Sequence, residues 1–218
     1  MKGTLYVVGV GPGDPELLTL KAVKTIRRAD VIAYPATERD SGTARHIAEQ
    51  AIPEIAQKEN LPLRFPMTRD DLTEAHRAAA EQLQAPLRAG KSVALLTLGD
   101  PGMYSTAYHV LGGLLERGYP VEFVSGVASF SAASARLQVP LAIGDESVLV
   151  TPGQFRDFPE TLVILKAGSR LDALKEKIRS AGKTAYLVEN CGMEGERAYS
   201  GIESFPPEAG YFSTLIVR

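Results

Sequence analysis

Apolar residues occur along the chain in short continuous runs that alternate with longer amphipathic segments. Residues 93–98 form one such run, and it ends in a Gly-Asp-Pro-Gly cluster at residues 99–102. Continuous apolar runs are typical of strands buried on both faces, and Gly, Asp and Pro mark turns. Apolar residues at helical spacing then begin at Tyr104. The pattern predicts a strand, a tight turn and a helix, the arrangement in which open α/β sheets bind ligands at the carboxyl ends of their strands.

The first half of the chain repeats this alternation of strand and helix. Besides residues 93–98, strands are expected at residues 4–9 and 30–34, with at best a short edge strand at residues 61–67, where two prolines lie. Helices are expected at residues 15–28, 43–51, 72–88 and 104–117. Asp14 and Pro15 suit the cap and the first position of the first helix. Such alternation predicts a mostly parallel sheet.

The second half is richer in strands and predicts a mixed sheet with two helices. Strands are expected at residues 121–124, 147–150, 162–166, 184–188 and 211–217, with a weaker hairpin at residues 192–200. One helix follows residues 125–130 and the other covers residues 171–180. The fold class is therefore α/β, and we place the boundary between a domain of residues 1–117 and a domain of residues 118–218.

Composition limits the classes of partner and the cellular compartment that we expect. The chain has 218 residues, of which 44% are hydrophobic and 23% charged, and its net charge of −2 offers no basic field for nucleic acid. Its single cysteine, Cys191, fits a reducing compartment. No export signal precedes the first strand, and no apolar stretch approaches the roughly 18 residues that span a bilayer. We expect a cytoplasmic protein with neither a nucleic-acid nor a membrane partner.

Two further loops are rich in small residues and directly follow predicted strands. Residues 9–15 read Gly-Val-Gly-Pro-Gly-Asp-Pro, in which the third glycine falls one place too early for the dinucleotide fingerprint. The two prolines also remove backbone donors that a phosphate would use. Residues 125–130 form a Gly/Ser loop, whose small residues permit close approach by a ligand or simply begin a helix.

Three motifs occur in a fixed order, at residues 8–15, 99–105 and 125–130. As a set they resemble the tetrapyrrole (uroporphyrin/corrin/porphyrin) methylases, and residues 188–190 and 211–217 extend the resemblance over essentially the whole chain. The resemblance implies two α/β domains with the cofactor site between them. It also implies S-adenosyl-L-methionine as methyl donor, a tetrapyrrole as substrate, and a homodimer.

Further short motifs look like one subgroup, which methylates C20 of precorrin-2 or cobalt-factor II in cobalamin biosynthesis. They lie at residues 34–35, 40–42, 64–67, 104–106 and 144–146. The uroporphyrinogen methylases usually carry Tyr-Asp where this chain has Tyr34 and Pro35, which argues against double methylation at the start of the pathway. The implied enzyme is a C20-methyltransferase, and the choice between metal-free precorrin-2 and cobalt-factor II stays open.

Two other functions compete with this one. The same fold could methylate a different corrin carbon, or the glycine-rich turns could serve a non-catalytic nucleotide-binding module. The misplaced third glycine counts against a dinucleotide binder. A scaffold role is disfavoured, because it has no use for three glycine-rich loops at strand ends.

The resemblance also assigns residues to the donor site. S-adenosylmethionine has no phosphate, so backbone hydrogen bonds and apolar walls suffice to hold it. Asp100 could accept hydrogen bonds from the methionine ammonium or from loop amides, and Lys166 places a cation where some relatives have an apolar residue. Carried over by motif, the donor-site residues are Pro12, Leu98, Gly99, Asp100, Met103, Ala128, Ser129 and Lys166, with Asn190, Cys191, Ser213 and Thr214 near the adenine.

Methyl transfer to a nucleophilic carbon mainly needs positioning and exclusion of water, so we predict no dedicated acid/base pair. Tyr34 and Tyr104 are candidates for orienting the macrocycle, although each could simply be packed. Arginines bind carboxylates well, and the candidates for the substrate's carboxylates are Arg39, Arg45, Arg64, Arg69 and Arg136. The histidines lack metal-ligand spacing with Cys191, so no protein-bound metal is predicted.

Overall fold

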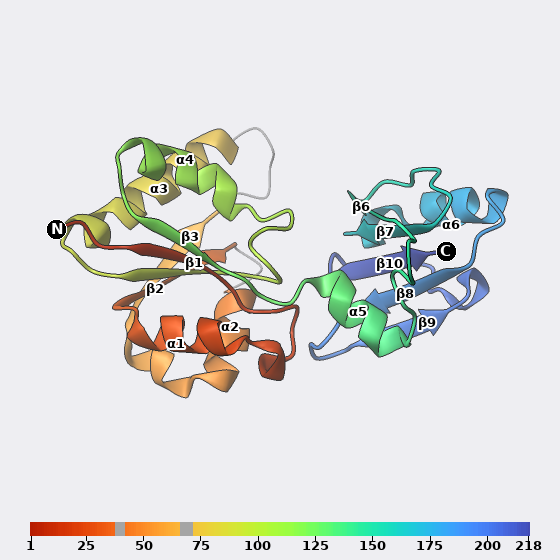
Figure 1. Cartoon of the computed structure of the whole chain (residues 1–218), viewed down its shortest axis with the longest axis horizontal. Coiled ribbons are helices and arrows are strands. Elements are labelled where there is room, and N and C mark those ends of the chain that lie inside the picture. The colour runs from red at the N-terminus through yellow and green to blue at the C-terminus, as the bar shows by residue number, and fades with distance from the viewer. Residues whose placement is uncertain (38–41, 66–71) are drawn as a thin grey trace. The chain divides into compact units, whose positions relative to one another are not determined.

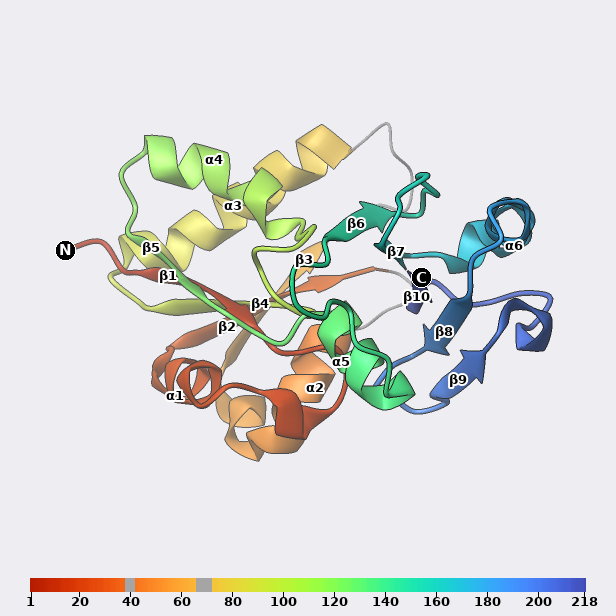
Figure 2. The same cartoon turned by 45° about the vertical axis from the view of Figure 1, so that its right-hand side comes forward.

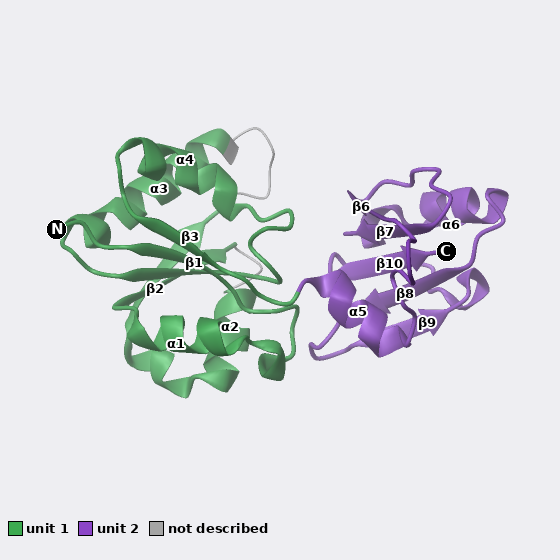
Figure 3. Cartoon of the chain, in the orientation of Figure 1, with its two compact units in different colours: residues 1–127 green, residues 128–218 purple. Residues whose placement is uncertain are grey.

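The computed structural model describes residues 1–37, 42–65 and 72–218. It divides into two compact units, Met1–Val127 and Ala128–Arg218 (Figure 3). The sequence-based boundary after Arg117 lies earlier than this division. The reason is that β5 (Val121–Val124) pairs in parallel with β1 (Leu5–Gly9) and so remains with the first unit.

The described strands of the first unit form one sheet with the order β3-β2-β4-β1-β5, and every pair in it is parallel (Figure 1). Besides β1 and β5, its strands are β2 (Val31–Ala36), β3 (Glu59–Arg64) and β4 (Val93–Thr97). The prediction of a mostly parallel sheet is confirmed. β3 lies at an edge as expected, where the missing N–H of Pro62 is tolerated.

Helices cover both faces of this sheet, α1 and α2 on one side and α3 and α4 on the other (Figures 1 and 2). The helical elements are η1 (Pro15–Leu17), α1 (Leu20–Arg28), α2 (Thr43–Ala51), η2 (Pro53–Gln57), α3 (Leu72–Arg88) and α4 (Ala107–Glu116). Leu5 and Val7 of β1 share a core cluster with Leu83 of α3 and Leu111 of α4. Each such buried side chain contributes about 1.5–3 kcal/mol.

Two predicted helices of this unit begin later than expected. The helix predicted at residues 15–28 is interrupted, because Asp14 caps only a short 3-10 turn and Thr19 caps a separate helix α1. The helix predicted from Tyr104 begins at Ala107. Tyr104 has a left-handed backbone with a φ of 51°, which no α-helix accepts.

The second unit contains a mixed sheet with the order β6-β7-β10-β8-β9, in which only β6 and β7 pair in parallel. Its strands are β6 (Val148–Pro152), β7 (Thr161–Leu165), β8 (Ala185–Glu189), β9 (Arg197–Ser200) and β10 (Ser213–Val217). Its helical elements are α5 (Ser129–Leu137), η3 (Gly168–Arg170), α6 (Leu171–Ser180) and η4 (Ile202–Ser204). The predicted hairpin at residues 192–200 contributes one strand, β9, which pairs with β8.

The two faces of this second sheet have separate cores. Leu215 and Val217 of β10 join the cluster that contains Leu174 of α6, whereas Ile216 joins the cluster that contains Ala133 of α5. This alternation follows from the period of two along a strand. In the parts of the chain that the structure describes, no helix is both long and apolar enough to cross a membrane.

Candidate functional site

The three glycine-rich loops meet at the carboxyl-terminal end of the strands of the first sheet. They follow β1, β4 and β5, which are neighbouring parallel strands and therefore end side by side. Gly11 and Gly99 exchange backbone hydrogen bonds of 2.7 and 3.2 Å. A Cβ atom on Gly126 would lie only 2.2 Å from the Gly99 carbonyl oxygen, so the third loop can pack here only with glycine at that position.

Asp100 joins the loop after β4 to the loop after β5. Its Oδ1 accepts a hydrogen bond of 2.7 Å from the Gly102 N–H, and its Oδ2 accepts one of 2.9 Å from the Gly126 N–H. Of the two roles predicted for this carboxylate, the structure shows the hydrogen bonds to loop amides. The geometry of the loops at these strand ends therefore depends on the side chain of Asp100.

The other donor-site candidates of the first unit lie on the same loops. Pro12 and Gly99 are buried, and Leu98 and Met103 are half-buried. The Met103 N–H donates to the Asp100 carbonyl oxygen at 3.1 Å, which closes the turn after β4. The structure thus brings all five first-unit candidates to one strand-end cluster.

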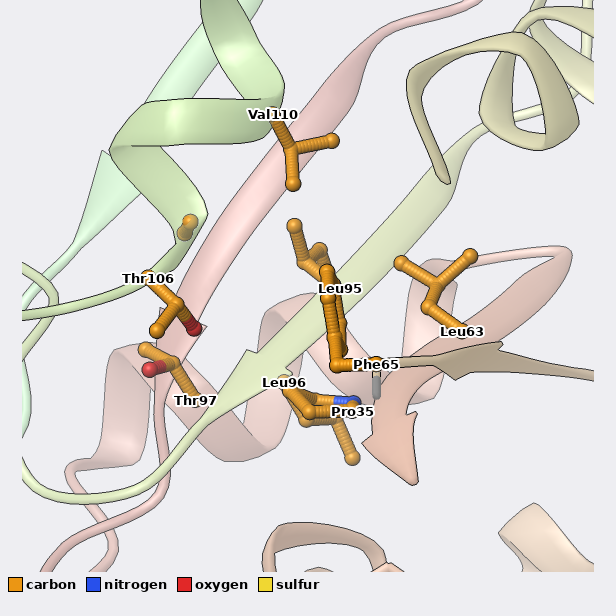
Figure 4. Close-up of a pocket in the computed structure, with 9 residues that line it drawn as sticks. Pro35, Leu63, Phe65, Leu95, Leu96, Thr97, Thr106 and Val110 are labelled. Carbon is orange, nitrogen blue, oxygen red and sulfur yellow. The ribbon is translucent and has the colours of Figure 1, made fainter. Parts of the chain in front are cut away.

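A small cavity lies behind this cluster, between β2, β4 and the start of α4 (Figure 4). Its volume is about 10 Å³, and apolar side chains such as Pro35, Phe65 and Val110 line it together with Thr97 and Thr106. This space is at the lower limit for a single water molecule. It is therefore too small to be the donor site that the motifs predict.

Most donor-site candidates of the second unit lie at one end of its sheet. β7 and β8 both end where the antiparallel β10 begins, so Lys166, Asn190 and Ser213 lie at the same edge. The Ala167 N–H donates to the Ser213 carbonyl at 3.2 Å, and the Asn190 N–H donates to the Phe212 carbonyl at 2.8 Å. The remaining candidates adjoin them in the chain or begin α5: Cys191, Thr214, Ala128 and Ser129.

Two of these residues have an unusual backbone conformation. Lys166 and Asn190 adopt left-handed φ angles of 56° and 49° directly after β7 and β8. Such conformations in non-glycine residues cost about 1–3 kcal/mol and concentrate at ligand sites. The Lys166 ammonium lies 5.4 Å from the centroid of the Tyr211 ring, a cation–π distance. The two left-handed residues therefore mark this strand end as a candidate ligand site.

Glu189 is a residue of this edge to which the sequence analysis assigned no role. It is buried, with 8% of its surface exposed. Its Oε1 accepts from the Gly210 N–H at 2.9 Å, and its Oε2 accepts from the Tyr199 hydroxyl at 3.4 Å. The sequence signal for a role of Glu189 is a carboxylate at the end of an apolar strand, because a buried carboxylate needs hydrogen-bond donors. Glu189 therefore shapes the segment that leads into Ser213.

The two tyrosine candidates differ in accessibility. Tyr34 is only 8% exposed, and the Arg45 guanidinium lies 5.8 Å from its ring centroid. A Cβ atom on Gly42 would lie 2.5 Å from the same ring, so the ring is tightly packed. Tyr104 is 46% exposed. Of the two, Tyr104 has the more accessible side chain.

Three of the five arginine candidates lie among the described residues. Arg45 forms an ion pair of 3.0 Å with Glu49, and Arg136 forms an ion pair with Glu196. Arg64 is exposed on β3. The other two predicted residues, Arg39 and Arg69, lie outside the described residues. Within the described ranges, no three His, Cys, Asp or Glu side chains gather as a metal site would require.

Comparison with known proteins identifies a matching family and two similar relatives. The sequence pattern of the Tetrapyrrole (Corrin/Porphyrin) Methylases matches residues 4–204. A Precorrin-2 C(20)-methyltransferase from Sinorhizobium sp is 35% identical, over 99% of this chain and 95% of that protein. A Cobalt-precorrin-2 C(20)-methyltransferase from Salmonella typhimurium is 30% identical, over 100% of this chain and 97% of that protein.

Solved structures of methyltransferases are also similar to this chain over nearly its whole length. The uroporphyrin-III C-methyltransferase of Thermus thermophilus, complexed with S-adenyl homocysteine, is 27% identical with a TM-score of 0.70, covering 99% of this chain and 97% of that chain. The cobalt precorrin-4 methyltransferase CbiF is 21% identical with a TM-score of 0.75, covering 98% of this chain and 94% of that chain, and shows the shared fold.

The matched residues 4–204 include all three glycine-rich motifs, and they span most of both compact units. The resemblance predicted from the sequence is therefore confirmed over nearly the whole chain. On these grounds the chain belongs to the tetrapyrrole (corrin/porphyrin) methylases.

Proposed function

We propose that this chain transfers a methyl group from S-adenosylmethionine to C20 of precorrin-2 or cobalt-factor II, in cobalamin biosynthesis. The observation that carries the proposal is the near full-length identity of 35% and 30% to two relatives that are named for methylation at C20. One of these relatives is named for precorrin-2 and the other for cobalt-precorrin-2. The metal content of the substrate is therefore the part that experiment must decide.

The strand-end loops fit a methyl donor that has no phosphate. In the first unit, the loop held by Asp100 would contact it through Leu98, Gly99 and Met103. In the second unit, Lys166 and Asn190 would do so, and their left-handed backbones support contacts through peptide groups. When bound, the sulfonium supplies an electrophilic methyl group for in-line displacement by a nucleophilic carbon.

The protein's own contribution to the reaction is positioning. Asp100 keeps the loops after β4 and β5 in register through two amide hydrogen bonds. Tyr104, which is exposed, orients the macrocycle, whereas Tyr34 supports β2 by packing. Proton loss from the methylated carbon can follow transfer, so the proposal includes no dedicated acid/base pair.

We also propose that the chain works as a homodimer in the cytoplasm. An exposed apolar patch supports the dimer: Tyr108 and Leu115 of α4 are 53% and 55% exposed, and Phe123 of β5 is 39% exposed. The Tyr108 and Phe123 rings stack 5.2 Å apart. Gly112 lies one helical turn from Tyr108. Apart from the adjacent backbone of its own helix, no atom of the described residues lies within 4 Å of a Cβ position there, which leaves room for a neighbour to approach closely. The lone cysteine supports a reducing compartment.

The deciding experiment is anaerobic incubation of the purified chain with S-adenosylmethionine and each tetrapyrrole, followed by product mass and methyl position. We expect one methyl group at C20 of one substrate. The Gly126→Ala variant should be inactive, because its Cβ would collide with the Gly99 carbonyl oxygen.

Methylation at another carbon would overturn the C20 assignment and keep the family. Absence of methylation, together with absence of S-adenosylhomocysteine binding, would overturn the enzyme proposal. A thermal-shift comparison of NAD with S-adenosylhomocysteine tests the nucleotide-binding alternative directly, since only one of the two ligands should stabilise the protein.

A further inference from the structure

A second, larger cavity lies within the second unit, and the donor site does not account for it. It has a volume of about 280 Å³ and lies between α6 and the loop that follows β6. Arg170, Leu174 and Lys177 line it from the start and one face of α6, at the spacing that places side chains on the same side of a helix. Phe155 and Arg156 line it from the loop.

The charged side chains that line this cavity are all positive. Arg156, Arg170 and Lys177 line it, and no Asp or Glu is among its lining residues. Basic residues elsewhere on α6 have acidic partners, as Arg179 has in Glu203 at 2.9 Å. Three like charges around one space repel each other, and a bound anion would relieve this repulsion. The N-terminal turn of α6 also favours negative charge at this position.

The two arginines keep most of their donors available. Arg170 donates to the Gly153 carbonyl at 3.4 Å, and Arg156 donates to the Gln154 side chain at 3.1 Å. A guanidinium has five N–H donors, so these bonds leave several for a ligand. Phe155 and Leu174 add apolar walls beside them. The arrangement suits a carboxylate carried on a short hydrocarbon stem.

The cavity adjoins the strand end that carries a donor-site candidate. The Gly153 N–H donates to the Leu165 carbonyl at 2.6 Å. A Cβ atom added to Gly153 would lie 3.6 Å from the Lys166 carbonyl oxygen, so this lining residue lies beside the Lys166 backbone. A ligand that reaches the end of β7 can therefore extend one substituent into this space.

We propose that Arg156, Arg170 and Lys177 bind a carboxylate side chain of the tetrapyrrole substrate, with Phe155 and Leu174 packed against its methylene groups. The inference rests on the proposed function, because that function supplies a substrate with many carboxylates. The volume of about 280 Å³ is below the range of pockets that enclose whole drug-sized molecules, so it accepts a substituent and not the macrocycle.

The test replaces the three cations by glutamine, singly and together, as Arg156→Gln, Arg170→Gln and Lys177→Gln. All three side chains are exposed, so the variants should fold. Each single variant should raise the KM for the tetrapyrrole about tenfold, as loss of a charged hydrogen bond does, with little change in kcat or in the KM for S-adenosylmethionine. Arg179→Gln is the matched control, since it removes the same charge from α6 beside Glu203 and should leave every constant unchanged.

A binding measurement makes the result independent of turnover. Titration with uroporphyrin, a porphyrin octacarboxylate, followed by its fluorescence, should show weaker binding to the triple variant than to the wild type and to Arg179→Gln. Unchanged porphyrin affinity and unchanged tetrapyrrole KM in the triple variant would overturn the inference while methyl transfer stands. A parallel rise in the KM for both substrates would also overturn it. If the wild type methylates neither tetrapyrrole, the proposed function fails, and the porphyrin titration alone decides whether this cavity binds carboxylates.

Discussion

At the scale of the residue, one carboxylate holds two glycine-rich loops together. Both oxygens of Asp100 accept loop amides, at 2.7 and 2.9 Å. Glu189 has a parallel role in the second unit, where it accepts the Gly210 N–H at 2.9 Å. Neither residue needs to touch a ligand in order to matter for binding. Each determines where the neighbouring backbone donors and acceptors lie.

Replacement of Asp100 by asparagine tests this role. Asp100→Asn keeps the size of the side chain but exchanges one acceptor for a donor that faces an N–H group, so one hydrogen bond is lost. Loss of a bond to a charged group should lower the free energy of unfolding by about 1.5–3 kcal/mol and weaken S-adenosylhomocysteine binding. Urea denaturation and calorimetric titration measure the two effects.

Asp172→Asn is the control, because the Asp172 side chain is 83% exposed in a surface ion pair. It should change stability by less than about 0.5 kcal/mol. If Asp100→Asn behaves like this control in both measurements, the hydrogen bonds between Asp100 and the loops are unimportant and our assignment of Asp100 is wrong.

At the scale of the element, α3 and α4 meet through two histidines. The His76 and His109 rings stack with centroids 4.9 Å apart and planes 17° apart, and Phe65 lies 5.6 Å from His76. Burial, and secondarily the nearby His109, hold the pKa of His76 below its ordinary value of 6.5. Protonation of His76 is therefore easier in the unfolded chain than in the folded one.

This contact predicts a loss of stability in acid. The unfolded state takes up a proton near the ordinary pKa of 6.5, while the folded state resists it, so the free energy of unfolding falls as pH falls from there towards the lower folded pKa. His76→Phe should retain ring stacking and lose part of this pH dependence. Urea denaturation at about pH 8 and about pH 5, on either side of the ordinary histidine pKa, measures the difference.

His46→Gln, which removes an exposed imidazole on α2, should keep the wild-type dependence. An identical loss of stability in His76→Phe and wild type between the two pH values would contradict the prediction. In that case groups other than the α3–α4 histidine pair would control the acid response.

At the scale of the whole molecule, the chain forms two units with different sheets and separate cores. The first sheet is parallel with helices on both faces, and the second is mixed. Both units present ligand-site candidates at one end of their sheet, on loops that follow or precede strands. The exposed patch of Tyr108, Leu115 and Phe123 belongs to the first unit and lies on α4 and the edge strand β5.

The proposed dimer predicts the behaviour of a charge in that patch. Leu115→Glu should shift the protein from dimer to monomer in sedimentation equilibrium, because a carboxylate would be buried without a partner. Leu20→Glu is the matched control, since Leu20 is 78% exposed on α1 and outside the patch, and it should remain dimeric. A dimeric Leu115→Glu variant would exclude this face as the interface, and a monomeric wild type would exclude the dimer itself.

Much of the site could be predicted because its motifs are continuous in sequence. Gly9 ends the first predicted strand, Gly99 and Gly126 lie in predicted loops, and the structure brings the three together. Tertiary contacts, in contrast, decided which polar partners they have. Asp100 finds the Gly126 N–H 26 residues away, and the ion pair of Arg136 with Glu196 depends on how α5 packs beside the strands of its unit.

The sequence by itself determined the types and order of most elements, the glycine loops and the family, because these depend on local periodicity, on turn chemistry and on motifs that are continuous in the chain. Only the tertiary structure decided that β5 belongs to the first unit, that Tyr34 is packed while Tyr104 is exposed, and that Arg156 and Lys177 line one cavity. Strand order and packing bring distant residues together, and no pattern within a short window encodes which residues will meet.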